Sequence, residues 1–153
     1  MRTIHASRFL KVALFADAAV TGAVALLQLL AGKLLAGLLA LPFVLLLESG
    51  VFMVLYVGLL LAMATRRRLW SWLVWAVIVG NVAWAVGCLS LLKPLPALVG
   101  LGIDGGGQAS SLGMAFLLIQ AFTALAFALL QWRGLHASSV AGAGEQSMKA
   151  LQT

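Results

Sequence analysis

The sequence predicts an all-α fold, a bundle of four helices that cross a membrane. Hydrophobic residues make up 63% of its 153 residues and charged residues only 9%, and the mean hydropathy is +1.11. Soluble proteins have about 45–50% apolar and about 25% charged residues. The apolar residues gather in four runs of roughly 20 residues, each long enough to span about 30 Å of hydrocarbon as a helix. A water-soluble domain of this length could not bury so much apolar surface.

The first two helices are expected at residues 12–31 and 42–64. Basic residues flank the first run, with Arg8 and Lys11 before it and Lys33 after it. The run is longer than the apolar core of a signal peptide, which has about 7–15 residues, so we expect it to be retained. Residues 34–41 are too short to span a membrane. They form either a turn of helix on the membrane surface or the lead-in to the second helix, whose first turn suits Pro42.

The third and fourth helices are expected at residues 70–92 and 112–132. The connection between them contains Pro94, Pro96 and the glycine triplet 105–107, which make a continuous helix implausible. We therefore expect a single four-helix transmembrane domain over residues 1–135. Residues 136–153 are small, polar and dotted with glycine, which predicts a disordered cytoplasmic tail.

The distribution of basic residues predicts the orientation. With the N-terminus inside, eight of the ten Lys and Arg residues lie on the inner side and only Lys33 and Lys93 on the outer side. Cytoplasmic segments carry such an excess of Lys and Arg, and tryptophans such as Trp70, Trp72 and Trp132 favour the membrane boundary. We expect a multi-pass inner-membrane protein, with both termini cytoplasmic and the lipid bilayer as its surroundings.

Two carboxyl groups lie inside apolar runs, where an ionisable group costs roughly 2.5 kcal/mol or more. In the first helix Asp17 shares a face with Thr21 and Gln28, all within about 40° on the helical wheel. This stripe is expected to point into the bundle because lipid offers it no hydrogen-bond partner. Glu48 lies on the outer half of the second helix, at a depth where Lys33 can pair with it. The two carboxyl groups are thus too far apart to share a proton.

The third and fourth helices carry further polar and small residues. Asn81 and Gln120 both lie near mid-membrane, where a hydrogen bond between them would join the two helices. A stripe of small residues on another face of the third helix allows close approach of a second helix, from this chain or from another one. The stripe consists of Ala76, Gly80, Ala83 and Gly87.

The sequence gives little support to catalysis or to a bound cofactor. Both histidines, His5 and His136, lie outside the expected helices, so the bundle has no histidine for a metal, a haem or a proton shuttle. No nucleophile-elbow or zinc-protease motif occurs. The single cysteine, Cys88, excludes an internal disulfide. The basic residues form no stripe interleaved with aromatic residues, which argues against a nucleic-acid partner.

Several segments resemble a group of small bacterial four-helix membrane proteins. The segments are residues 15–22 (FADAAVTG), 37–42 (GLLALP), 75–84 (WAVIVGNVAW), 115–121 and 130–132. In size and topology the chain is similar to the DoxX-like proteins, and the similarity covers about residues 10–135. The resemblance implies a four-helix membrane bundle and brings no catalytic residue with it.

These observations favour a non-enzymatic role. The leading interpretation is a structural or interaction bundle that acts alone, as a homo-oligomer or with another membrane protein. The alternative is a proton-linked transporter of small molecules, or a ligand-binding bundle, in which Asp17 is the ionisable residue. An enzyme acting on lipid or quinone would need a polar cavity that reaches Asp17 or Glu48.

Overall fold

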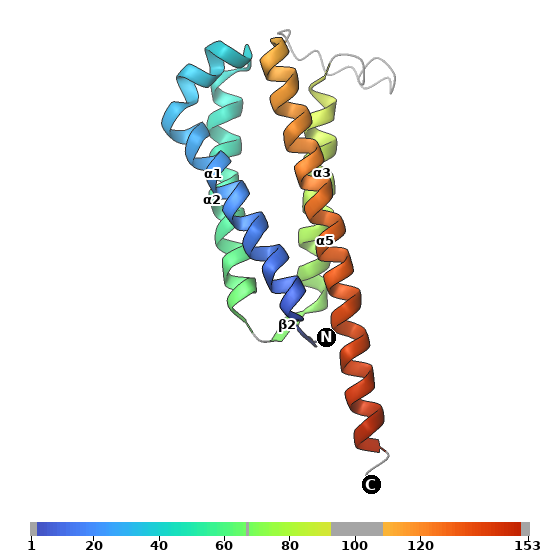
Figure 1. Cartoon of the computed structure of the whole chain (residues 1–153). Helices are drawn as coiled ribbons and strands as arrows, with labels where there is room; N and C mark the ends of the chain where they lie inside the picture. Colours follow the sequence, from blue (N-terminus) through green and yellow to red (C-terminus); the bar gives the residue numbers. More distant parts are fainter. Residues whose placement is uncertain (1–2, 67, 93–108, 151–153) are drawn as a thin grey trace.

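The computed structural model describes residues 3–66, 68–92 and 109–150, and it contains four long helices (Figure 1). They are α1 (Arg8–Leu39), α2 (Phe43–Thr65), α3 (Ser71–Ser90) and α5 (Ser111–Ala150). All four are long and apolar enough to cross a membrane, α5 over its part Ser111–Ser138. The predicted all-α fold with four apolar helices is confirmed.

A short two-stranded ribbon, which the sequence did not predict, lies at the end of the bundle where the chain begins. Strand β1 (Thr3–His5) pairs antiparallel with β2 (Arg68–Trp70), which follows the turn after α2. Ile4 lies opposite Leu69 in this ribbon, and the Leu69 side chain is buried. The ribbon ties the N-terminal residues to the α2–α3 connection.

Helix α1 is longer than predicted at both ends. It begins at Arg8 because Ser7 caps it, the Ser7 hydroxyl accepting a hydrogen bond from the Leu10 amide at 3.2 Å. The helix bends at Ala31, whose backbone is non-helical, and continues to Leu39. The apolar stretch 34–41 is therefore mostly the last part of α1, and Ala40 ends it in a left-handed conformation with φ of 51°.

Helix α5 continues far beyond the predicted end at residue 132. It runs to Ala150, so residues 136–150 are helical where a disordered tail was expected (Figure 1). Its turn around Gly134 and Ser138 packs against the start of α1, and the buried Leu135 belongs to the same contact. This contact keeps the helix regular past the expected boundary. Most of the predicted connection 93–111 lies outside the described residues.

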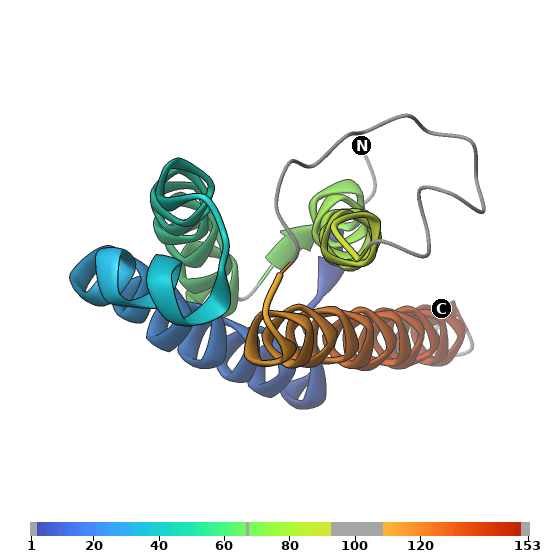
Figure 2. The same cartoon turned by 90° about the horizontal axis from the view of Figure 1, so that it is seen from above.

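The helices form two antiparallel pairs, α1 with α2 and α3 with α5, which are joined through α1 and α5. Over the described residues, α2 and α3 have few close backbone contacts with each other. Figure 2 shows α2 (green) and α3 (yellow-green) apart from each other on one side of the bundle, with α1 and α5 along the other side. The bundle therefore has one loosely packed side, between α2 and α3.

Helices α1 and α5 are bonded to each other at both ends. At one end the Ser110 hydroxyl donates to the Leu38 carbonyl at 2.7 Å and also caps α5 by accepting from the Gly113 amide. At the other end the Ser7 amide donates to the Ser138 hydroxyl at 3.0 Å. Glycines allow the close approach: a Cβ at Gly113 would collide with the Leu39 carbonyl, and one at Gly134 would lie 2.9 Å from the Leu10 Cα.

The predicted stripe of small residues makes no close helix contact with the part of the chain that the structure describes. Its members Ala76, Gly80, Ala83 and Gly87 are all exposed. A Cβ added at Gly80 or at Gly87 would meet no atom within 4 Å. The tightest approaches are instead at Gly113 and Gly134 of α5.

Two apolar cores fill the bundle, one towards each end. One core gathers large side chains such as Leu10, Leu14 and Leu60 near the ribbon, and the other lies around Leu46 and Leu117 near the α1–α2 turn. A layer of polar side chains lies between them. Large hydrophobic side chains also cover the outside, as lipid contact requires.

Substituting Gly134 tests the close contact between α1 and α5. Gly134→Ala places a methyl group against the Leu10 backbone, which should destabilise the bundle by about 1–3 kcal/mol through overpacking. The matched control is Gly58→Ala on α2, where an added Cβ meets nothing within 4 Å. Unfolding of the detergent-solubilised variants should separate the two substitutions. Equal stabilities would contradict the close packing at Gly134.

Candidate functional site

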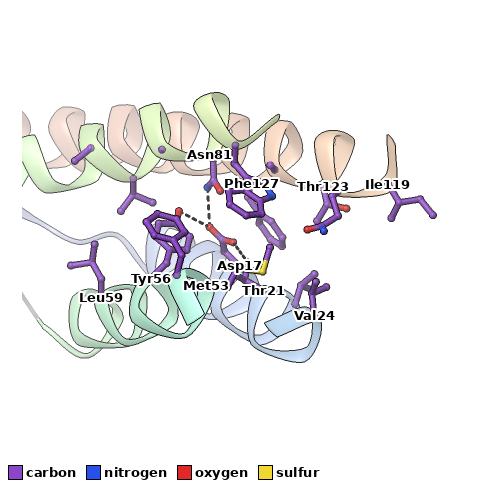
Figure 3. A pocket seen from close by; sticks show the side chains of 18 residues that line it. Asp17, Thr21, Val24, Met53, Tyr56, Leu59, Asn81, Ile119, Thr123 and Phe127 are labelled. Atoms are coloured by element: carbon purple, nitrogen blue, oxygen red, sulfur yellow. Dashed lines mark hydrogen bonds between the residues drawn. The ribbon is translucent and has the colours of Figure 1, made fainter. Parts of the chain in front are cut away.

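The Asp17 side chain lies inside the bundle and is only 1% exposed. Its Oδ2 atom accepts hydrogen bonds from Gln131 Nε2 at 2.7 Å, Asn81 Nδ2 at 2.9 Å and the Tyr56 hydroxyl at 3.5 Å. Its Oδ1 atom accepts one from the Thr21 hydroxyl at 3.0 Å, one turn further along α1. Figure 3 shows Thr21, Tyr56 and Asn81 turned towards the carboxylate.

These donors come from all four helices and form one layer. Asn81 Nδ2 also donates to Gln131 Oε1 at 3.1 Å, which closes the network between α3 and α5. Asp17 lies nine residues after the first residue of α1, Tyr56 nine before the last of α2 and Asn81 ten after the first of α3. The helices thus present their polar residues at the same depth.

Hydrogen-bond donors alone compensate the charge of the Asp17 carboxylate. Over the described side chains no Lys, Arg or His bonds to it, and no buried polar side-chain atom is left without a hydrogen bond. Donors aimed at an ionised carboxylate form stronger hydrogen bonds than neutral pairs do. In its ionised form Asp17 adds a net negative charge to the apolar interior, and an isolated charge there is costly.

A cavity of about 270 Å³ lies beside this carboxylate, between α2 and α3 (Figure 3). Its wall is mostly apolar, and its polar side chains come from all four helices. These polar residues are Asp17, Thr21, Tyr56, Asn81, Gln120 and Thr123. We call this the inner cavity, because it lies on the predicted inner side of the second cavity described next.

A second cavity of about 410 Å³, here called the outer cavity, lies nearer the α1–α2 turn. Its polar wall includes Gln28, Glu48 and Ser49. The Ser49 hydroxyl donates to Gln28 Oε1 at 3.2 Å, so Gln28 is bonded at this level and not to Asp17. The buried Cys88 also lines this cavity.

The remaining residues predicted from the sequence have separate positions. Glu48 and Lys33 are both exposed, and no ion pair joins them in the described part of the chain. Gln120 is half-buried, lines both cavities and makes no side-chain hydrogen bond with the described residues. The expected hydrogen bond between Asn81 and Gln120 is not formed, because Asn81 is bonded to Asp17 and Gln131. Of the residues predicted from the sequence, Thr21 and Asn81 are thus the ones that bond to Asp17.

Sequence reasoning missed Tyr56 and Gln131 as partners of Asp17. Counted from residue 12, the first residue of the expected helix, Asp17 lies nearer to its helix end than Tyr56 or Asn81 does. The signal that places it correctly is Ser7, a preferred helix-capping residue just before Arg8. Counted from this cap, Asp17 lies at the level of Tyr56 and Asn81.

The described residues contain no cluster suited to a metal ion. No group of three or more His, Cys, Asp and Glu side chains lies together within them. What the site can do chemically follows from its parts: a carboxylate with four fixed donors at one end of an apolar cavity can bind a molecule that brings positive charge or a hydrogen-bond donor.

Comparison with known proteins gives no match: no family model, no curated protein and no solved structure corresponds to the chain.

Replacing Asp17 tests how much the network stabilises the bundle. Asp17→Leu leaves buried donors of Asn81 and Gln131 without an acceptor and should cost about 3 kcal/mol or more, since each lost partner costs about 1–3 kcal/mol. Asp17→Asn keeps one oxygen acceptor and should cost about 1–2 kcal/mol. Unfolding in mixed micelles measures both.

Glu48→Leu is the matched control, because it removes an exposed carboxyl group without a hydrogen bond in the described region. Its stability should change by about 0.5 kcal/mol or less. An Asp17→Leu variant as stable as Glu48→Leu would refute the network.

Proposed function

We propose that this chain is a multi-pass membrane protein that binds a small molecule inside its bundle, with Asp17 as the polar contact. The observation that carries the proposal is the inner cavity, which reaches a buried carboxylate. A carboxylate with a purely structural role needs only its hydrogen-bond donors. Here the same side chain also borders space in which a ligand fits.

The form of the cavity supports binding rather than catalysis. Ligand sites are concave and mostly apolar, with a few polar groups that fix orientation, and typically measure about 300–1,000 Å³. The inner cavity is near the lower end of this range, which favours a small ligand. Beside the carboxylate it offers amide, hydroxyl and phenol groups, and it has no paired acid and base for a proton-transfer reaction.

We also propose that both termini are cytoplasmic, in a bacterial inner membrane, as the DoxX-like resemblance implies. An even number of spans brings the two ends of the bundle to one side, and Figure 1 draws the N-terminus and the long extension of α5 at the same end. Arg8, Lys11, Arg66 and Arg133 lie at this end of the four membrane-spanning segments. Cytoplasmic segments have this excess of basic residues.

A second candidate function is an interaction bundle that assembles with copies of itself or with another membrane protein. The exposed stripe of Ala76, Gly80, Ala83 and Gly87 supports it, because small residues without packing partners allow a second helix to come close. Ala83 lines neither cavity. Ala83→Leu therefore tests assembly, measured as mass in detergent, without changing the ligand site.

The ligand site is tested by filling it. Gly80 lines the inner cavity and has open space beside it, so Gly80→Leu should occupy the cavity without disturbing the packing. Gly58→Leu, also with open space but outside both cavities, is the control. We would measure the melting temperature of each protein with a panel of benzylamine, benzyl alcohol and benzyltrimethylammonium.

A ligand that binds only the folded state raises the melting temperature in proportion to the logarithm of its concentration above Kd. At least one panel compound should stabilise the wild type and Gly58→Leu equally, and the effect should be clearly smaller in Gly80→Leu. If no compound stabilises the wild type, or if both variants respond alike, the binding proposal fails.

A further inference from the structure

We infer that the inner and outer cavities are two successive binding sites on one route for an apolar organic cation, separated by the stacked rings of Phe52 and Trp84. The inference rests on the proposed binding function of the Asp17 cavity. It adds the class of ligand, a second site and the barrier between the two sites.

The charge of the cavity walls selects a cation. Each cavity has one carboxyl group in its wall, Asp17 in the inner cavity and Glu48 in the outer one. Neither lining includes a Lys, Arg or His side chain, and neither carboxyl group has an ion pair among the described residues. An anion would meet uncompensated negative charge in both cavities. A cation would supply the counter-charge that both lack.

Aromatic rings in the walls fit the same ligand. Phe52 and Trp84 border both cavities, with Tyr56 and Phe127 added in the inner one and Phe116 in the outer one. A cation over the face of such rings gains about 0.5–2 kcal/mol, most with Trp and most when water is excluded. The remaining wall is apolar, so the ligand needs an apolar body around its charge.

Three residues connect the two cavities. Phe52, Trp84 and Gln120 line both of them, so the cavities meet at these side chains. The Phe52 and Trp84 rings are stacked there, with centroids 6.0 Å apart and planes inclined by 8°. Gln120, at the same point, makes no side-chain hydrogen bond with the described residues and can bond to a passing ligand.

The stacked pair also lies at the loosest part of the bundle. Phe52 belongs to α2 and Trp84 to α3, the two helices with few close backbone contacts. Side-chain rotation or a small separation of these helices would part the rings, while α1 and α5 stay bonded at both ends. The barrier can therefore open without breaking the packing that holds the bundle.

The class of ligand is tested with a matched pair of probes. Benzyltrimethylammonium and neopentylbenzene have the same shape and differ in one atom, nitrogen against carbon, and so in charge. Binding to the protein in lipid nanodiscs, corrected with empty nanodiscs, should be at least tenfold tighter for the cation. Gly80→Leu should remove binding at the inner cavity and leave only the site in the outer cavity.

The route is tested by uptake of labelled benzyltrimethylammonium into proteoliposomes. Glu48→Gln, which changes an exposed side chain, should lower the uptake rate severalfold and leave binding at the inner cavity in place. Trp84→Ala should raise the rate severalfold by removing the barrier. The control Trp75→Ala removes an exposed indole of the same helix that borders neither cavity, and should leave the rate unchanged.

The outcomes separate this inference from the proposed function. If neopentylbenzene binds as tightly as the cation and Gly80→Leu removes the inner site for both, the inner cavity binds small molecules but the cation inference is wrong. If the cation binds but uptake is the same for wild type, Glu48→Gln and Trp84→Ala, the two-site route is wrong. If neither probe binds, both proposals fall. None of these three conclusions depends on a substitution of Asp17.

Discussion

The hydrogen bonds to the Asp17 carboxylate are the constraint on which the bundle depends. A carboxylate in an apolar interior is tolerated only where donors replace the water that it loses. Here the donors are Thr21 of α1, Tyr56 of α2, Asn81 of α3 and Gln131 of α5. Each helix must therefore lie at one depth and one rotation. Apolar packing alone would allow a helix to shift or rotate relative to its neighbours, because one apolar side chain can take the place of another.

The rest of the bundle divides into a fixed part and a loose part. Helices α1 and α5 are bonded through Ser110 at one end and through Ser7 and Ser138 at the other, with glycines where they touch. Helices α2 and α3 have no comparable contact with each other in the described region, and both cavities lie along them. Space for a ligand thus occurs along the two helices that contact each other least, beside the carboxylate that all four helices hold.

The sequence was sufficient to predict the four helices and the burial of Asp17, because length, hydropathy and the cost of a charge in lipid decide these features. It was not sufficient to predict the partners of Asp17. The helical phase of a residue shows on which face of its helix it lies, but its depth in the membrane depends on where the helix begins. Helix α1 begins at Arg8, after the cap Ser7, whereas the apolar run begins only at Val12. The positions of the cavities depend on how the pair α1–α2 packs against the pair α3–α5. The sequence of a single helix does not predict this packing. The helical extension to Ala150 was not predicted, because the composition of residues 136–153 contains no information on the contact between Gly134 and Leu10.

The order of the Asp17 partners along the chain has a consequence for biosynthesis. Gln131, the donor with the shortest bond, lies 114 residues after Asp17, and Asn81 lies 64 residues after it. At about 5–20 residues per second, a ribosome needs several seconds or more to supply them. Thr21 is four residues away on the same helix and is synthesised at once. Its hydroxyl can bond to the carboxylate as soon as the first helix forms, and so accompany the charge into the bilayer before the other helices arrive.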